Sequence, residues 1–260
     1  LAHIRQLDPL NHFAAIETWL HNPTSENSTA IRKLITNEMP HQSYLEVGIW
    51  YNSIGLTADA LKVFSLSAPC PEIEFWKAYL TDSRLDFSKI DLNLSFPFRS
   101  ETGKVLEALL QKENHWILRY QLALLYKDRN RTNEAKTLLN ACGNEPDFAP
   151  FYATRAAICQ GDDAGKTLAD YQKAISLDKG WRYQKLLTQY YLNQHQPEKA
   201  LPVVQQYYSA HPSDYIMGML YAKTLLLNKK YAETDAVLGK LQIIPFEGAT
   251  DGRELYRETK

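Results

Sequence analysis

A pattern of small and large side chains returns about every 34 residues along the chain. In one copy, Gly48 is followed by Tyr51, Gly55, Ala60 and Phe64. Copies at the same offsets are Ala123, Tyr126, Asn130, Ala135 and Leu139; Thr188, Tyr191, His195, Ala200 and Val204; and Ala222, Leu225, Lys229, Thr234 and Leu238. A fifth copy, with Ala156, Cys159, Thr167 and Tyr171, lacks one residue in its turn. A period of this length indicates an array of stacked structural repeats.

Each copy has the apolar spacing of two helices joined by a short turn. The two small positions, such as Gly48 and Ala60, are expected where the helices of a pair cross most closely. A bulky side chain there would cost roughly 1–3 kcal/mol through overpacking. One pair cannot bury its apolar surface alone, so successive pairs must stack. The sequence therefore predicts an all-α chain of stacked helical pairs.

The order of small, aromatic, turn, small and large residues resembles the tetratricopeptide (TPR) repeat over nearly the whole chain. The resemblance implies a right-handed α-solenoid of about seven TPR-like helical hairpins, in a single superhelical domain over 1–260. The predicted units are 8–40, 41–74, 75–115, 116–148, 149–180, 181–214 and 215–248, with a capping helix over 249–260. The third unit carries an insertion at 82–99. Its Phe87, Phe96 and Phe98 either fold back as a plug, which is the favoured interpretation, or present a docking surface.

A second resemblance concerns the segments 96–109, 122–152 and 243–256. They look like the C-terminal repeat region of large bacterial proteins, in which the repeats follow a β-rich domain of unknown function with the character of carbohydrate enzymes. The chain opens with Leu1, and its first residues are interpreted as the tail of a helix. We therefore expect this chain to be a piece of a longer protein, and we leave its compartment open.

Composition narrows the classes of function. The chain has 29 basic and 30 acidic residues, so bulk charge does not favour binding to nucleic acid or to anionic lipid. No run approaches the ~18–20 apolar residues of a membrane-spanning helix, so no membrane insertion is predicted. The only partner that the sequence suggests is a protein or peptide, which includes the missing domain of the same protein. The oligomeric state is left open.

Motifs that carry chemistry are weak in this sequence. Cys70, Cys142 and Cys159 form neither a disulfide framework nor a metal-ligand spacing, and no histidine pair has zinc-ligand spacing. The run Gly161–Thr167 has three residues between its glycines where a phosphate-binding loop needs four, and it lies between two predicted helices. The sequence therefore predicts no enzyme activity, no catalytic residue, no cofactor and no metal.

The resemblance also implies where a ligand binds, because the first helices of TPR pairs line a concave surface. Positions three before and one after the first small residue face this groove. They are Leu45 and Ile49, Tyr120 and Leu124, Ala153 and Ala157, Lys185 and Gln189, and Met219 and Lys223. The Lys and Asn set of a TPR clamp for peptide carboxylates is not met. The candidate binding residues are Tyr120, Arg182, Lys185, Gln189 and Lys223, which form either ordinary surface or a patch for an acidic or extended peptide.

The leading hypothesis is a non-catalytic scaffold that binds a peptide or a domain on its concave face. A second hypothesis makes the repeats an accessory or oligomerisation module of a carbohydrate-related enzyme whose catalytic domain is absent. A third is an α/α-barrel enzyme, which would need inward-facing carboxylates around a closed cavity.

Overall fold

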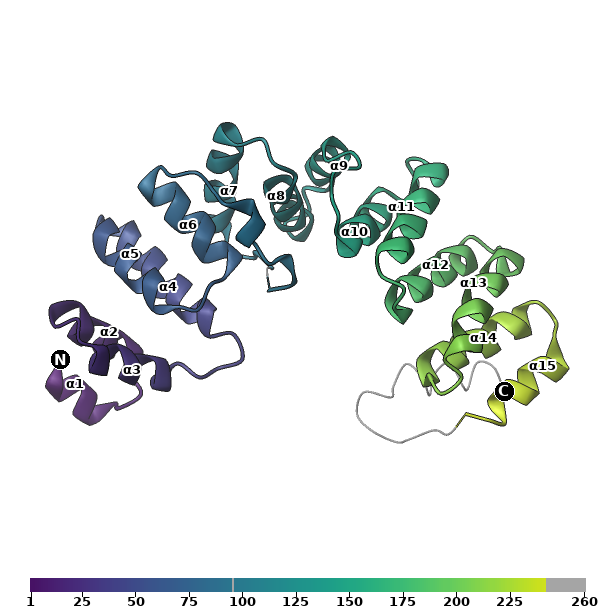
Figure 1. Cartoon of the computed structure of the whole chain (residues 1–260), viewed down its shortest axis with the longest axis horizontal. Coiled ribbons are helices and arrows are strands. Elements are labelled where there is room, and N and C mark those ends of the chain that lie inside the picture. The colour runs from purple at the N-terminus through teal and green to yellow at the C-terminus, as the bar shows by residue number, and fades with distance from the viewer. Residues whose placement is uncertain (95, 242–260) are drawn as a thin grey trace. The chain divides into compact units, whose positions relative to one another are not determined.

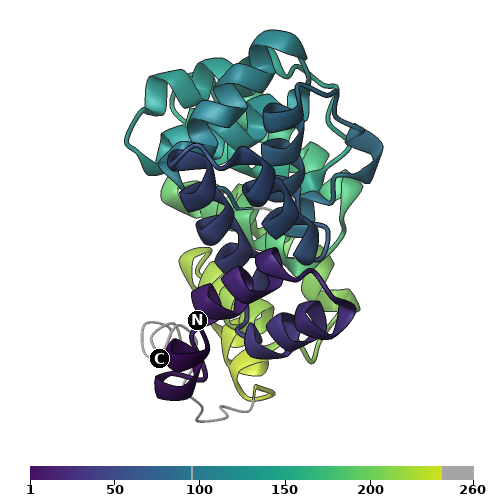
Figure 2. The same ribbon diagram turned by 90° about the vertical axis from the view of Figure 1, so that its left-hand side faces the viewer.

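The computed structural model describes residues 1–94 and 96–241, and in this part of the chain every regular element is a helix (Figures 1 and 2). The predicted capping helix over 249–260 lies outside the described residues. The chain divides into two compact units, Leu1–Glu145 and Pro146–Lys260, and each is described by itself. The single continuous domain stays a prediction.

The first unit contains nine described α-helices and two short 3₁₀ segments. They are α1 (Ala2–Leu7), α2 (His12–His21), α3 (Ser25–Leu34), α4 (Pro40–Ser53), α5 (Thr57–Leu66), α6 (Pro71–Thr81), η1 (Phe87–Lys89), η2 (Leu92–Leu94), α7 (Ser100–Lys112), α8 (Trp116–Asp128) and α9 (Thr132–Ala141). Helices contact each other in the pairs α2/α3, α4/α5, α6/α7 and α8/α9, and α6 begins at Pro71, before the predicted start of the third unit at 75.

The second unit contains three pairs among its described residues. They are α10 (Ala149–Cys159) with α11 (Ala164–Leu177), α12 (Trp181–Asn193) with α13 (Pro197–Ala210), and α14 (Tyr215–Leu227) with α15 (Tyr231–Leu238). The helix α13 begins at Pro197 and continues through Pro202.

The pairs stack in the order that the repeat predicts. A second helix contacts the first helix of the next pair, as in α5 with α6, α11 with α12, and α13 with α14. First helices of successive pairs also contact each other, as in α4 with α6 and α12 with α14. The all-α, stacked helical-repeat fold is therefore confirmed.

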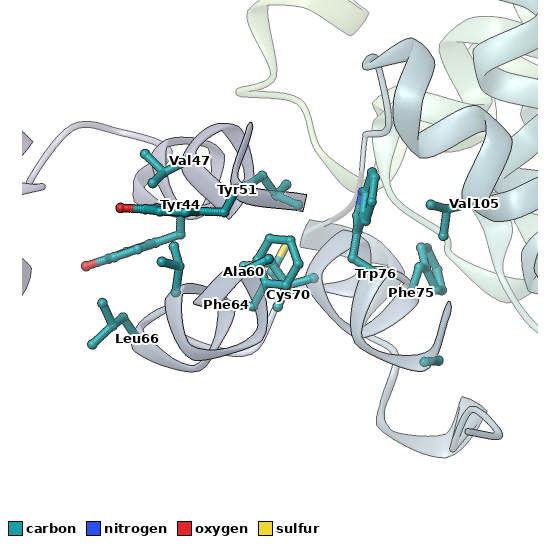
Figure 3. Close-up of a cluster of buried hydrophobic side chains, with 14 of the residues drawn as sticks. Tyr44, Val47, Tyr51, Ala60, Phe64, Leu66, Cys70, Phe75, Trp76 and Val105 are labelled. Atoms are coloured by element: carbon teal, nitrogen blue, oxygen red, sulfur yellow. The ribbon is translucent and has the colours of Figure 1, made fainter. Parts of the chain in front are cut away.

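The small repeat positions lie where helices touch. A Cβ atom added to Gly48 in α4 would stand 2.2 Å from Cε1 of Phe64 in α5, and Phe64 is fully buried (Figure 3). The other small positions, Ala60, Ala123, Ala135, Ala156, Thr188, Ala200 and Ala222, are also fully buried. Side-chain size at these positions therefore sets how closely the helices approach.

The residue seven after the first small position has a left-handed backbone in four turns. Its φ is +85° at Gly55, +60° at Asn130, +55° at His195 and +61° at Lys229. Glycine adopts this conformation without a steric penalty, whereas other residues have a Cβ clash. The repeated turn geometry explains why the sequence keeps its spacing at this position although the residue type varies.

The third pair differs from the hairpins that the repeat predicts, because its two helices run parallel. At their C-terminal ends, Asp82 pairs with Lys112, and the Leu85 N–H donates to Glu113 Oε1 at 3.0 Å. The middle of α6 meets the first turn of α7, where Trp76 Nε1 donates to Thr102 Oγ1 at 3.0 Å, and near the start of α6 the Phe96 N–H donates to Glu72 Oε1 at 3.0 Å. Residues 82–99 therefore run back along α6, whose eleven residues span about 16 Å, before α7 begins.

This return reverses the direction of the helices that follow within the first unit. Residues 113–115 join α7 to α8, and Arg129 at the end of α8 donates to the Phe98 carbonyl at 2.6 Å, close to the start of α7. Since α8 is antiparallel to α7, it runs opposite to α6. The first helices α6 and α8 thus have opposite polarity, which the repeat spacing alone does not reveal.

The insertion both covers the core and exposes aromatic rings. Leu85, Phe87, Ile90 and Leu92 pack against the core of the first unit. In contrast, the side chains of Phe96 and Phe98 are 75% and 48% exposed. The plug interpretation therefore describes the first part of the insertion, up to Leu92, and does not describe Phe96 and Phe98.

Candidate binding surface

Within residues 1–94 and 96–241, no cluster of His, Cys, Asp and Glu side chains could hold a metal ion. In the glycine-containing run Gly161–Thr167, Asp163 caps α11 by accepting from the N–H groups of Gly165 and Lys166. The run is an inter-helical turn and a helix cap, as its short glycine spacing predicted. Among the described helices, none has the length and apolar character needed to cross a bilayer.

The thiols lie in packed surroundings. Cys70 and Cys142 are buried and Cys159 is half-buried. The Cys70 thiol donates to Glu72 Oε2 at 2.9 Å, and burial, with the nearby Glu72 charge, raises the pKa of Cys70 to about 12. The raised pKa favours the neutral thiol over the reactive thiolate at neutral pH. Cys70 contributes to the packing around α6.

Two tyrosines at the same repeat position bind carboxylates of preceding helices. Tyr51 donates its hydroxyl to Glu17 of α2, and Tyr126 donates to Glu107 Oε1 of α7 at 2.7 Å. Burial and this hydrogen bond raise the pKa of Tyr126 to about 12, so it stays a neutral donor. These carboxylates are bound within the stack, which gives them a structural role.

The structure separates the five predicted binding residues. Tyr120 lies on α8 of the first unit and is 4% exposed, so we do not include it in the surface considered below. Leu45, Ala153 and Met219, at groove positions of other first helices, are buried as well. Arg182, Lys185 and Gln189 lie on α12 and Lys223 lies on α14, and these two helices contact each other in the second unit.

The first turn of α12 groups two cations around one indole ring. The Arg182 guanidinium carbon lies 5.4 Å from the centroid of Trp181, and Lys185 Nζ lies 5.8 Å from it. Each such contact contributes about 0.5–1 kcal/mol at an exposed site and orders the cation. Neither Arg182 nor Lys185 forms an ion pair with any residue that the structure describes. A positive field therefore extends from this end of α12.

Two exposed apolar side chains lie at the ends of α14, on the same helix face as Lys223 and separated by the buried Met219 and Leu220. Ile216 is 44% exposed and Leu227 is 49% exposed, and the half-buried Lys223 lies between them in the sequence. The three residues stand at i, i+7 and i+11, which places them on one face of a helix. Sequence reasoning missed Ile216 and Leu227 because it considered only the positions next to the small residue. Extending the same face by whole turns would have found both.

Comparison with known proteins finds similar solved structures but no matching family. No family model matches the chain, and no curated protein matches it. Solved structures that are similar include a thermophilic TPR protein of Thermus thermophilus, at 18% identity and a TM-score of 0.42, covering 72% of this chain and 99% of that one. A tetratricopeptide repeat protein of Parabacteroides merdae has 14% identity and a TM-score of 0.48 over 84% of this chain and 87% of its own.

A third similar structure contains TPR-like repeats of a putative kinesin light chain from Podospora anserina. Its identity is 13% and its TM-score 0.45, covering 86% of this chain and 99% of that one. In its fold the chain is similar to tetratricopeptide repeat proteins.

Proposed function

We propose that this chain is a non-catalytic scaffold that binds a protein segment on the surface formed by α12 and α14. The observation that carries the proposal is the pair of cations on α12, Arg182 and Lys185, which lie beside Trp181 and form no ion pair with a described residue. A surface of this charge favours an acidic partner and increases its association rate.

The chemistry of the surface fits an extended peptide. Gln189 on α12 is half-buried and carries both a donor and an acceptor, which can bind a peptide backbone. Ile216 and Leu227 add apolar contacts at the two ends of α14. Such a surface binds through several modest contacts, and rigid helices reduce the entropy lost on binding.

Reversing the charge of the surface tests the proposal. The double variant Lys185→Glu with Lys223→Glu should weaken binding of an acidic partner segment by at least about tenfold and should reduce the dependence of affinity on salt. The probe is a synthetic peptide rich in glutamate and leucine, with capped termini, titrated by calorimetry at two salt concentrations.

A matched control keeps the same change in net charge. Lys173 on α11 and Lys199 on α13 are exposed lysines of second helices in the same unit. Lys173→Glu with Lys199→Glu should leave most of the affinity intact. Equal losses in the two double variants would show that only net charge matters, and unchanged affinity in both would remove the surface from consideration.

The parent protein remains a separate question. The resemblance to repeat regions that follow a β-rich domain stays a prediction, and in that case the occupant of the surface would be a segment of the missing domain. Binding of the isolated chain to a recombinant neighbouring domain, compared with the same charge-reversed variant, would test this version of the proposal.

A further inference from the structure

One face of α12 carries an unbroken stripe of accessible side chains. The four residues of this stripe are spaced at i, i+4, i+7 and i+11, and they are Arg182, Leu186, Gln189 and Asn193. Each is exposed or half-buried, and Leu186 is 36% exposed. The buried side chains of α12, Tyr183, Leu187 and Thr188, lie away from this face. The stripe is therefore open to a ligand along the length of the helix.

The polar side chains of the stripe have no partners among the residues that the structure describes. Arg182 contacts the Trp181 ring but forms no ion pair, and the amides of Gln189 and Asn193 form no hydrogen bond to a described residue. An amide side chain both donates to and accepts from a peptide backbone. A helical ligand bonds its backbone groups internally, whereas an extended segment leaves them free. These amides therefore favour an extended ligand.

The spacing along the stripe sets a register for such a ligand. Arg182 and Leu186 are four residues apart, which is about 6 Å along the axis at 1.5 Å per residue. In an extended segment, side chains two positions apart point to the same side and are about 6.6 Å apart. Side chains at odd separations point to opposite sides, so they cannot both meet α12.

From this match we infer that α12 selects an extended segment in which an acidic and an apolar residue stand two positions apart. The inference rests on the proposed function and adds the register of the ligand to it. The carboxylate would pair with Arg182 while the apolar side chain packs on Leu186. Charge favours this occupant, because Arg182 and the neighbouring Lys185 are cations without an ion pair in the described part of the chain.

The amides at the far end of the stripe extend the motif. The next residue of the segment on the same side would lie about 13 Å from the carboxylate, taking about 3.3 Å per residue. Gln189 and Asn193 are about 10 and 16 Å beyond Arg182 along α12, so this residue falls between them. A polar side chain there would bond to both amides. The expected motif is therefore acidic, any, apolar, any, polar, in one of the two chain directions.

A peptide series of constant composition tests the register. Six nonapeptides, acetylated and amidated, carry leucine at position 5 and a single glutamate at 1, 3, 4, 6, 7 or 9, with alanine and serine elsewhere. Their affinities for the full chain are measured by chemical-shift titration. One of the peptides with glutamate at 3 or 7, two positions from leucine, should bind about fivefold more tightly than those with glutamate at 4 or 6, as expected for one exposed ion pair. The direction in which the segment runs decides which of the two it is.

The peptides with glutamate at 1 and 9 test the conformation of the ligand. Residues four apart in a helix lie on one face about 6 Å apart. A helical ligand would therefore place one of these glutamates over Arg182 with its leucine over Leu186. An extended ligand should leave both peptides as weak as those with glutamate at 4 or 6. Tightest binding by glutamate at 1 or 9 would overturn the extended register.

Variants assign the preference to named residues. Arg182→Gln should abolish the preference for glutamate position, whereas the matched change Lys199→Gln on α13 should leave it intact. Leu186→Ser should weaken all six peptides together, because each contains the leucine. Arg182 and Leu186 are both accessible, so the fold should survive either change, and circular dichroism checks that it does.

The outcomes separate this inference from the proposed function. Equal affinity of all six peptides, with binding still lost in Lys185→Glu with Lys223→Glu, would overturn the register and keep the acidic-segment surface. Absence of binding by every peptide would overturn both. A preference that survives Arg182→Gln would place the carboxylate elsewhere and would overturn the register alone.

Discussion

The helical pairs α4/α5 and α6/α7 belong to the same unit but are held together in different ways. In α4/α5 the helices are antiparallel, residues 54–56 form the turn, and Gly48 lets Phe64 approach the backbone. In α6/α7 the helices are parallel, and the connecting residues are fixed by polar contacts at Glu72 and Glu113. The packing of α4/α5 depends on side-chain size, whereas that of α6/α7 depends on hydrogen bonds to the residues that connect the two helices, 82–99.

The largest effect should come from filling the space beside Gly48. Gly48→Val places atoms inside the ring of Phe64, which is fully buried and cannot move without disturbing the core. We expect the free energy of unfolding to fall by about 3 kcal/mol, the upper end for overpacking. Urea denaturation measures this change in the free energy of unfolding.

A double-mutant cycle identifies the cause of that loss. Phe64→Leu alone removes buried ring atoms and destabilises the chain. Combined with Gly48→Val, it should cost clearly less than the sum of the two single changes, because the smaller side chain makes room for the valine. Additive losses would show that the contact between these two residues does not set the spacing of the helices.

The next largest loss of stability should come from removing the Glu72 carboxylate, which holds the return segment, residues 82–99 between α6 and α7. Glu72 is 2% exposed, and its two oxygens accept from the Cys70 thiol and from the Phe96 N–H at 2.9 and 3.0 Å. Glu72→Leu leaves both donors without this acceptor, and we expect a loss of about 2 kcal/mol. Hydrogen exchange at the Phe96 amide should become faster.

Glu74 provides the matched control for Glu72. It lies on the same helix, is half-buried, and its carboxylate pairs with Lys77 at 2.9 Å. Such a surface pair contributes at most about 1 kcal/mol, so Glu74→Leu should change stability little and should not alter exchange at Phe96. Similar effects of the two substitutions would mean that Glu72 does not hold the return segment.

The comparison also shows what the sequence can predict. The repeat positions, which depend on local side-chain size, predicted the helical pairs and their order. The parallel direction of α7 could not be predicted, because it follows from contacts over long sequence separations, such as Phe96 with Glu72 and Asp82 with Lys112. The length of the insertion was visible, but its path depends on which polar groups it meets.

For the candidate surface too, some features could be predicted from the sequence and others could not. Periodicity placed Lys185, Gln189 and Lys223 on neighbouring first helices, which the structure contains. The burial of Tyr120 could not be inferred from its position, because a groove position is exposed only where the neighbouring helices leave it open. The contact of Lys185 with Trp181 could have been predicted from their i, i+4 spacing in the first turn of α12, whereas that of Arg182, at i+1, could not.

The left-handed residues in the turns of the regular helical pairs should give a smaller effect of opposite sign, a gain in the free energy of unfolding. Lys229 has a φ of +61° and Gly55, at the same repeat position, has +85°. Lys229→Gly should stabilise the chain by about 1 kcal/mol, since glycine adopts this backbone without the clash of a Cβ atom. Gly55→Ala should destabilise it by a similar amount. Thermal unfolding measures the change in stability of both variants. A loss of stability in Lys229→Gly would contradict the steric account of the turn.

The smallest effect concerns pH and the start of α8. The His115 ring stacks on the ring of Phe87, which lies in residues 82–99 between α6 and α7, with 3.6 Å between the ring centroids. Its Nδ1 accepts from the Ile117 N–H at 3.2 Å and so caps the start of α8. Burial lowers the pKa of His115, with Arg119 acting in the same direction and Glu145 and Glu113 acting against it. As the pH falls below about 6.5, the His115 ring is protonated in the unfolded chain, whereas in the folded chain it stays neutral until a lower pH.

The contribution of His115 to stability is thus complete above the pKa of the unfolded chain and is lost as the pH falls towards the lowered pKa. His115→Asn keeps a side-chain acceptor at the cap but cannot be protonated. Because it also loses the stacking on Phe87, the variant should be less stable than the parent chain near neutral pH, and this difference in the free energy of unfolding should shrink between neutral and mildly acidic pH. A parallel pH dependence in the two proteins would show that other groups, and not this cap beside the return segment, determine the response to acid.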